Sequence, residues 1–184
     1  MSRIFTVALI ATLALPVLAL AALVGQQEYL IANARILNVP LVGYDPRDLL
    51  RGQYIAGQFD WDWAGEPSFP QSNGAVCVLA SDAPKPRVRF IAGWKAGDPV
   101  ESDCRMVVAG RGEPSRRSAP ARFSPTDLDQ GNGTVHIFVP EERARDLEGL
   151  IRDRPGALTV DLAVRANGRA SIAGLRVNGQ RLGR

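Results

Sequence analysis

The chain has 184 residues and a formal net charge of +3. After a membrane segment this length leaves enough residues for one domain with its own core and too few for two. The small net charge argues against nucleic-acid binding, and nearly all the positive charge is arginine, because Lys85 and Lys95 are its lysines.

An uncharged apolar segment at residues 4–24 directly follows Arg3. As a helix it measures about 30 Å, the thickness of the hydrocarbon core of a bilayer. A cation at its start predicts that everything from Gln26 onward lies outside the cytoplasm. We therefore expect a signal-anchor or transmembrane segment at residues 1–25 and an exported domain at residues 26–184.

The same segment also has features of a cleaved signal peptide. Ala19-Leu20-Ala21 fits the small-x-small pattern after which signal peptidase cuts, and Pro16 would end the helix shortly before it. However, the apolar run is long for a signal peptide and long enough to span a membrane. We favour a retained anchor, with cleavage after Ala21 as the alternative.

The rest of the chain predicts a mainly β domain, antiparallel and barrel-like or sandwich-like. Runs rich in Val, Ile and aromatic residues alternate with clusters of Pro, Gly, Asp and Ser. These runs lie at residues 35–42, 53–63, 75–80, 87–94, 105–109 and 134–139. Residues 110–133 have no periodicity, which predicts a long surface loop.

The C-terminal third gives the clearest local signals. One packed helix is expected at residues 140–153, because Pro140 suits a first helical position and Pro155 would end it. Apolar and polar residues then alternate at residues 158–165, which predicts a half-buried strand. Asn167-Gly168 and Asn178-Gly179 predict tight turns around a returning strand, with a bulge at Gly174.

A short motif at residues 45–54 has a clear structural interpretation. Asp45 can cap a short helical turn, Pro46 suits its first position, and Asp48 occupies the place of the acid in a capping box. Gly52 can take the left-handed conformation that ends the turn. A strand is expected to begin at Gln53.

This motif resembles the signature of the GDYXXLXY-domain proteins, which are bacterial membrane-anchored proteins of uncharacterised function. The residues that carry the resemblance are Asp45, Pro46, Arg47, Asp48, Leu49, Leu50, Arg51, Gly52, Gln53 and Tyr54. Gly52 and Tyr54 match the named motif. Its acid, leucine and final tyrosine are replaced by Gln53, Gly57 and Phe59. The C-terminal helix and hairpin are also similar to the family's layout.

The resemblance implies an exported β-rich domain on one anchor in the bacterial inner membrane, facing the periplasm. It also implies a polytopic membrane protein as a neighbour, because members of the family often occur alongside one. If the family's acid were catalytic, Gln53 could not replace it as a proton carrier, and this chain would be inactive.

Two acids next to indoles form the candidate catalytic site. Asp60 and Asp62 are expected on one face of a strand, with Trp61 and Trp63 on the other. Carboxylates beside aromatic platforms can bind or cleave glycans, and Glu66 would be a further acid for this chemistry. The alternative is that the indoles belong to the core and the acids are solvated.

Cys77 and Cys104 would form one disulfide in an oxidising compartment, whereas Cys77 between two valines also suits a plain core position. His136 is the single histidine, so we expect no metal site, and no motif calls for a cofactor. A set of loop arginines could contact anionic lipids or envelope polymers, with a solvated loop as the alternative. This set is Arg111, Arg116, Arg117 and Arg122.

The sequence contains no complete catalytic signature, such as a nucleophile elbow or a phosphate-binding loop. We therefore expect a binding or assembly module of the cell envelope that partners an integral membrane protein. The alternative function is a carboxylate-dependent glycan hydrolase, or a glycan-binding protein, that uses Asp60, Asp62 and Glu66.

Overall fold

The computed structural model describes residues 3–43, 54–65, 71–80, 84–114, 121–128, 134–139, 143, 147, 149–150, 153–154 and 156–182. The chain divides into two compact units, Met1–Ala34 and Arg35–Arg184. Each unit is described by itself.

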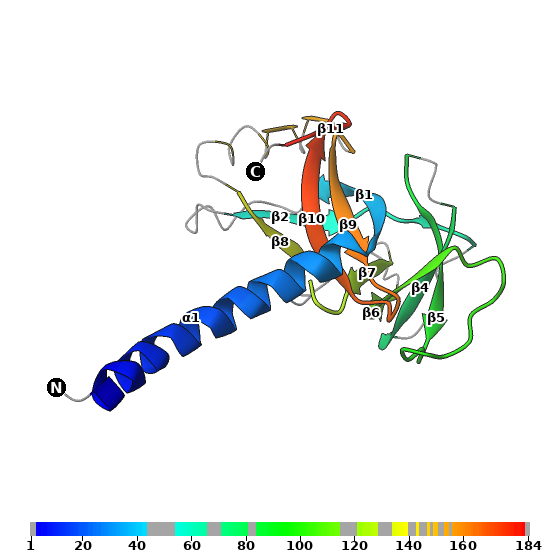
Figure 1. Cartoon of the computed structure of the whole chain (residues 1–184). Helices are drawn as coiled ribbons and strands as arrows, with labels where there is room; N and C mark the ends of the chain where they lie inside the picture. The colour runs from blue at the N-terminus through cyan, green and yellow to red at the C-terminus, as the bar shows by residue number, and fades with distance from the viewer. Residues whose placement is uncertain are drawn as a thin grey trace. The chain divides into compact units, whose positions relative to one another are not determined.

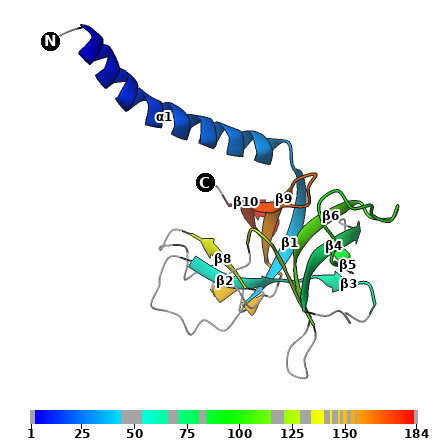
Figure 2. The same ribbon diagram turned by 90° about the horizontal axis from the view of Figure 1, so that it is seen from below.

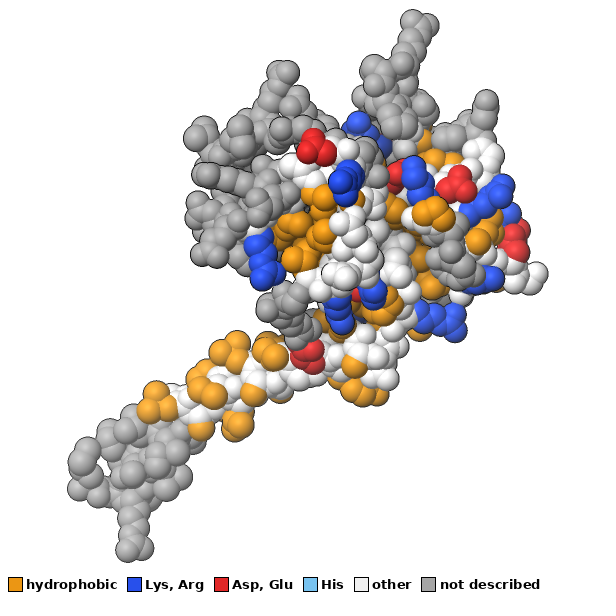
Figure 3. Space-filling view, turned by 90° about the horizontal axis from the view of Figure 1, so that it is seen from above, with side chains coloured by type: hydrophobic (Ala, Val, Ile, Leu, Met, Phe, Trp, Pro, Cys, Tyr) orange, Lys and Arg blue, Asp and Glu red, His pale blue; other side chains and the backbone are white. Residues whose placement is uncertain are grey.

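The first unit is built on one helix, α1 (Arg3–Ala32), which has Pro16 inside it (Figure 1). The break at Pro16 that belonged to the cleavage alternative is therefore absent. Large apolar side chains point outward along α1, among them Leu15 at 71% and Val24 at 62% exposure. Thr12–Ala32 is long and apolar enough to cross a membrane and is 0% buried, and Figure 3 shows hydrophobic side chains along both edges of the helix.

The helix continues beyond the apolar run. It passes the predicted end at residue 24 and adds about two turns before Ala32. The backbone N–H and the side-chain amide of Asn33 both donate to the carbonyl oxygen of Tyr29, at 3.2 and 2.8 Å. These bonds satisfy a carbonyl that a helix terminus leaves without an intrahelical partner.

The second unit contains two curled β-sheets, as the sequence predicts (Figure 2). The six-stranded sheet has the order β11-β10-β9-β1-β2-β8 and is antiparallel. Its strands are β1 (Arg35–Gly43), β2 (Tyr54–Phe59), β8 (Val135–Phe138), β9 (Leu158–Val164), β10 (Ala170–Val177) and β11 (Gln180–Arg181).

The five-stranded sheet has the order β3-β5-β4-β6-β7. Its strands are β3 (Asp62–Trp63), β4 (Ser72–Ala80), β5 (Arg87–Ala92), β6 (Met106–Glu113) and β7 (Arg122–Pro125). Its pairs are antiparallel except β3 with β5, which is parallel and differs from the antiparallel expectation.

The hydrophobic core combines residues from both sheets. Alternate residues of a strand share one face, so each sheet presents an apolar inner surface. On β1 this surface consists of Leu37, Val39 and Leu41, and on β9 of Leu158, Val160 and Leu162, all 0% exposed. On the five-stranded sheet the core includes Val76 and Val78 of β4 and Phe123 of β7.

The turns and the bulge of the C-terminal hairpin agree with their sequence signals, but β9 is not half-buried as predicted, because Asp161 and Ala163 on its second face are 2% and 0% exposed. Gly168, Asn178 and Gly179 have positive φ, as the two tight turns require. The pairing of β9 with β10 shifts between Ile172 and Gly174, where the sequence predicts a bulge. These turns depend on local backbone preferences, so the sequence is sufficient to predict them.

Two loop and strand assignments are wrong. The sequence predicts a surface loop at residues 110–133, but β6 extends to Glu113 and β7 occupies Arg122–Pro125. β7 pairs only with β6 among the described strands, so its formation depends on a distant partner more than on its own pattern. The run at 53–63 is also divided, because β2 ends at Phe59 and β3 begins at Asp62.

The helix expected at residues 140–153 lies largely outside the described residues. Within it, Arg143, Leu147, Gly149, Leu150 and Asp153 have helical backbone. Leu147 is 6% exposed and Leu150 packs against the core. At the described positions, the apolar face therefore packs as predicted.

Candidate functional site

The family-like motif is divided by the limits of the described structure. A set of its residues lies outside the described ranges: Asp45, Pro46, Arg47, Asp48, Leu49, Leu50, Arg51, Gly52 and Gln53. Tyr54 begins β2 and pairs with Phe138 of β8. Phe59 ends β2, is 6% exposed and belongs to the core. The C-terminal part of the motif therefore lies within the six-stranded sheet.

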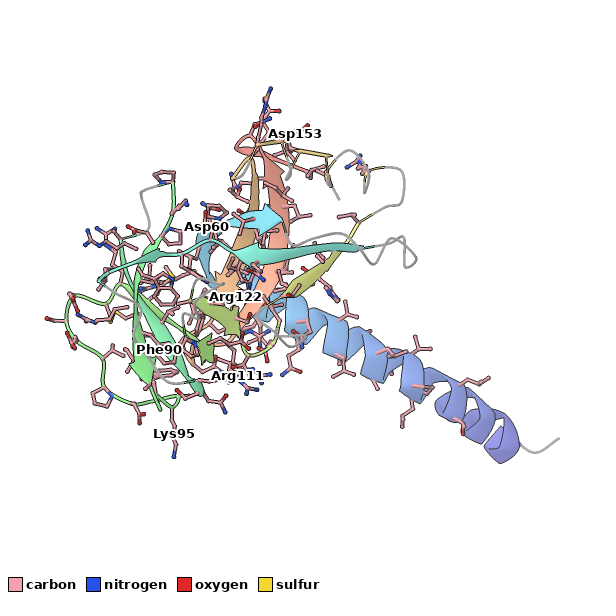
Figure 4. All side chains as sticks on the ribbon, turned by 180° about the vertical axis from the view of Figure 1, so that it is seen from behind. Asp60, Phe90, Lys95, Arg111, Arg122 and Asp153 are labelled. Carbon is pink, nitrogen blue, oxygen red and sulfur yellow. A yellow bond between two sulfur atoms is a disulfide. The ribbon has the colours of Figure 1, made fainter. Side chains whose placement is uncertain are left out.

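Asp60 lies between β2 and β3, at the passage from one sheet to the other (Figure 4). Its backbone N–H donates to the Pro40 carbonyl at 2.9 Å. Its carboxylate lies 2.6 Å from Nζ of Lys85 and its side chain is 21% exposed. The carboxylate thus has a cationic partner in Lys85.

Asp62 is exposed on β3, and its backbone N–H donates to the Pro86 carbonyl at 3.1 Å. Glu66 lies outside the described residues. The structure therefore gives positions for two of the three proposed catalytic acids, and one of these two is held by Lys85.

Trp61 belongs to the core, in agreement with the structural interpretation of the indoles. It is 6% exposed, and its indole N–H donates to the Phe123 carbonyl at 3.1 Å. Its ring lies 5.9 Å from Phe123 in an edge-to-face arrangement and 5.8 Å from Phe59. Trp61 therefore connects the stretch after β2 to β7 of the other sheet. A sugar cannot stack on this ring.

Trp63 is half-buried and packs against the same core. Phe90 of β5 extends the aromatic cluster, with its ring centroid 6.2 Å from that of Phe123. Such tilted aromatic pairs contribute beyond the area that they bury. The aromatic residues near the two acids thus have a structural role in joining the sheets.

Cys77 and Cys104 are joined by a disulfide, with their Cα atoms 5.4 Å apart. Cys77 lies on β4 and is 0% exposed, and Cys104 lies just before β6. Asp103 completes the one group of metal-ligating atoms found among the described residues. Because both sulfurs are bonded to each other, neither is a thiolate that could hold an ion.

The structure describes two of the four loop arginines, and these lie on neighbouring strands. Arg111 is exposed on β6, and Arg122 is half-buried on the neighbouring strand β7 (Figure 4). Arg116 and Arg117 lie outside the described residues.

A buried carboxylate on β9 is a feature that the sequence does not reveal. Asp161 is 2% exposed and accepts a hydrogen bond from Nε of Arg176 at 2.7 Å. This bond, and then the negative charge of Asp161, raise the pKa of Arg176 above its ordinary value. Nε of Arg181 lies 3.9 Å from the same carboxylate. The alternation at 158–165 puts Asp161 on the polar face, but only the strand pairing brings the arginines to it.

The chain matches the family model described as GDYXXLXY protein over residues 16–175. Neither the curated proteins nor the solved structures include one that matches the chain. The family match covers most of α1 and nearly all of the β domain. The chain therefore belongs to the GDYXXLXY protein family.

Proposed function

We propose that this protein is a membrane-anchored module of the bacterial cell envelope, with its β domain in the periplasm, where it binds an integral membrane protein. The observation that carries the proposal is the exposed apolar surface of α1. Its candidate span is 0% buried, and a helix that is apolar on all sides needs a lipid or protein environment.

The side of the membrane is proposed on two grounds. Arg3 precedes the apolar run, which favours a cytoplasmic N-terminus. The disulfide between Cys77 and Cys104 fits an oxidising compartment, since cytoplasmic thiols are kept reduced. Both grounds support a periplasmic β domain.

The proposed partner, a polytopic membrane protein, comes from the resemblance to the family. The hydrolase alternative has less support, because Trp61 is in the core and Asp60 is paired with Lys85. A binding module needs neither acid, whereas the hydrolase needs both.

The test is an affinity capture of the full-length protein from membranes, with mass spectrometry of the intact bait and its companions. A bait that begins at Met1, resists extraction with alkaline carbonate and brings down a polytopic membrane protein is the expected result. A bait cut after Ala21 that is recovered alone would contradict both the anchor and the partner.

A paired variant separates the two functions. Asp60→Asn together with Asp62→Asn is expected to capture the partner as well as the wild type does. Loss of turnover of envelope glycans in this variant, with wild-type turnover measured first, would instead support the hydrolase. Lys85→Gln provides the matched control, because it breaks the ion pair of Asp60 but keeps both acids.

A further inference from the structure

Four arginines gather at the end of the β domain that follows the anchor in the chain. We define the arginine end as Arg35, Arg105, Arg165 and Arg169. Arg35 is the first residue of β1 and of the second unit. We propose that the arginine end binds the headgroups of anionic phospholipids in the membrane that holds α1. This proposal rests on the proposed anchoring of α1.

Strand pairing and hydrogen bonds connect the four residues. Arg35 pairs with Val164, the last residue of β9, and Nη1 of Arg35 donates to the Arg105 carbonyl at 2.9 Å. Arg165 and Arg169 flank the turn that follows β9, where the Arg165 N–H donates to the Arg169 carbonyl at 2.9 Å. The group is therefore assembled from the starts of β1 and β6 and from the β9–β10 turn.

The arginine end stands on a rigid support. The Gly168 carbonyl accepts a hydrogen bond at 2.8 Å from the N–H of Ala109 in β6, so the turn is attached to the other sheet (Figure 1). Asp127, which follows β7, holds the Arg169 guanidinium through contacts of 2.6 and 2.9 Å. The guanidinium group of Arg169 is thus held in place before it meets a ligand.

The composition of the arginine end fits an anionic surface. Arg35, Arg105 and Arg169 are exposed and Arg165 is half-buried. The set contributes four guanidinium groups, and Asp127 pairs with that of Arg169. Guanidinium groups bind phosphate oxygens through two parallel hydrogen bonds, which suits lipid headgroups.

The length of the chain keeps the arginine end near the membrane. The apolar run ends at Val24, and α1 and the turn after it lead to Arg35. At the helical rise the distance from Val24 to Arg35 is at most about 20 Å, and the headgroup layer fills about 5 to 8 Å of it. Helix tilt and the length of an arginine side chain shorten the remaining distance between the guanidinium groups and the lipid headgroups. This distance is then about one Debye length, which is about 8 Å in physiological salt.

The test uses the full-length protein in nanodiscs of phosphatidylcholine, or of phosphatidylcholine and phosphatidylglycerol in a ratio of about 7 to 3. Phenylglyoxal modifies exposed guanidinium groups, and mass spectrometry gives the rate for each arginine. Arg154 serves as the control within the same molecule, because it is exposed and lies near the opposite end of β9.

We expect modification of Arg35, Arg165 and Arg169 to be about fivefold slower in the anionic discs. A factor of this size is what the attraction of one arginine to an anionic lipid surface provides. Arg154 should react equally in both discs. Salt at about 0.5 M shortens the Debye length to about 4 Å and should remove the difference.

Variants separate charge from structure. Arg35→Gln with Arg165→Gln should abolish the protection of Arg169, whereas Arg35→Lys with Arg165→Lys should keep most of it. Equal rates in the two discs, whether fast or slow, would overturn the proposal while α1 still anchors the protein. If the protein does not elute with the discs, the anchoring itself fails and the lipid contact falls with it.

Discussion

At the scale of single residues, Gly168 shows how the absence of a side chain lets the two sheets approach. Its φ is +79°, and a Cβ there would lie 3.0 Å from the Trp94 ring and 3.3 Å from the Ala109 Cβ. Gly168 therefore satisfies both a backbone requirement and a packing requirement.

Gly168→Ala should lower the free energy of unfolding by more than the turn alone explains. Gly179 is the matched position, because its φ is +81° and nothing lies within 4 Å of its Cβ direction. We expect Gly179→Ala to cost about 1 to 2 kcal/mol and Gly168→Ala about 1 to 3 kcal/mol more. Urea denaturation of the full-length protein in detergent measures both, and equal losses would exclude a packing role for Gly168.

Trp61 and Trp94 differ in what their indole N–H groups contact. The Trp61 N–H donates to the Phe123 carbonyl, whereas Nε1 of Trp94 is buried without a hydrogen-bond partner among the described residues. Trp61→Phe removes the donor from a buried carbonyl and should cost about 1 to 3 kcal/mol. Trp94→Phe removes an unsatisfied donor and should cost less, as thermal unfolding followed by circular dichroism can check. A larger loss for Trp94→Phe would contradict this assignment.

At the scale of strands, two aspartate–arginine pairs differ mainly in burial. Asp161 on β9 is 3% exposed in its side chain, and Asp127 after β7 is 24% exposed. Asp161→Asn should cost about 1.5 to 3 kcal/mol, because a buried charged hydrogen bond is weakened. Asp127→Asn should cost about 1 kcal/mol or less, since its partner Arg169 is exposed to solvent. Urea denaturation compares them, and the reverse order would show that burial does not set their strength.

The predictability of the strands follows from how local their signals are. The strand at β9, the turns at Gly168 and Asn178 and the bulge at Gly174 depend on alternation and backbone preference, so the sequence predicts them. β7 has no such pattern and exists through its pairing with β6. The division between β2 and β3 likewise follows from Trp61 entering the core, which only the packed structure reveals.

The candidate site, too, could be predicted from the sequence only where the signals are local. The sequence places Asp60 next to Trp61 but contains no sign that Lys85, after β4, reaches the carboxylate. The arginine end is assembled from β1, the start of β6 and the β9–β10 turn, which are far apart in the chain. Contacts of this kind depend on sheet order, and sheet order is not a local property.

At the scale of the whole molecule, the disulfide closes a long loop, because its cysteines are 27 residues apart. Replacing both by alanine should lower the free energy of unfolding by about 3 to 4 kcal/mol on the chain-entropy model. Urea denaturation with and without reductant measures this. The wild type in reductant should approach the variant in oxidising buffer, and no change in either would contradict a stabilising role.

The complete burial of Cys77 also has a consequence for biogenesis. A thiol that is 0% exposed in the middle of β4 is out of reach of any oxidising enzyme once the five-stranded sheet has closed. Cys104 is half-buried, so in a closed domain it is the sulfur that such an enzyme could join in a mixed disulfide, which the Cys77 thiolate would then attack to release the enzyme. Oxidation by this route thus begins at Cys104, and the buried Cys77 completes the bond from inside the domain.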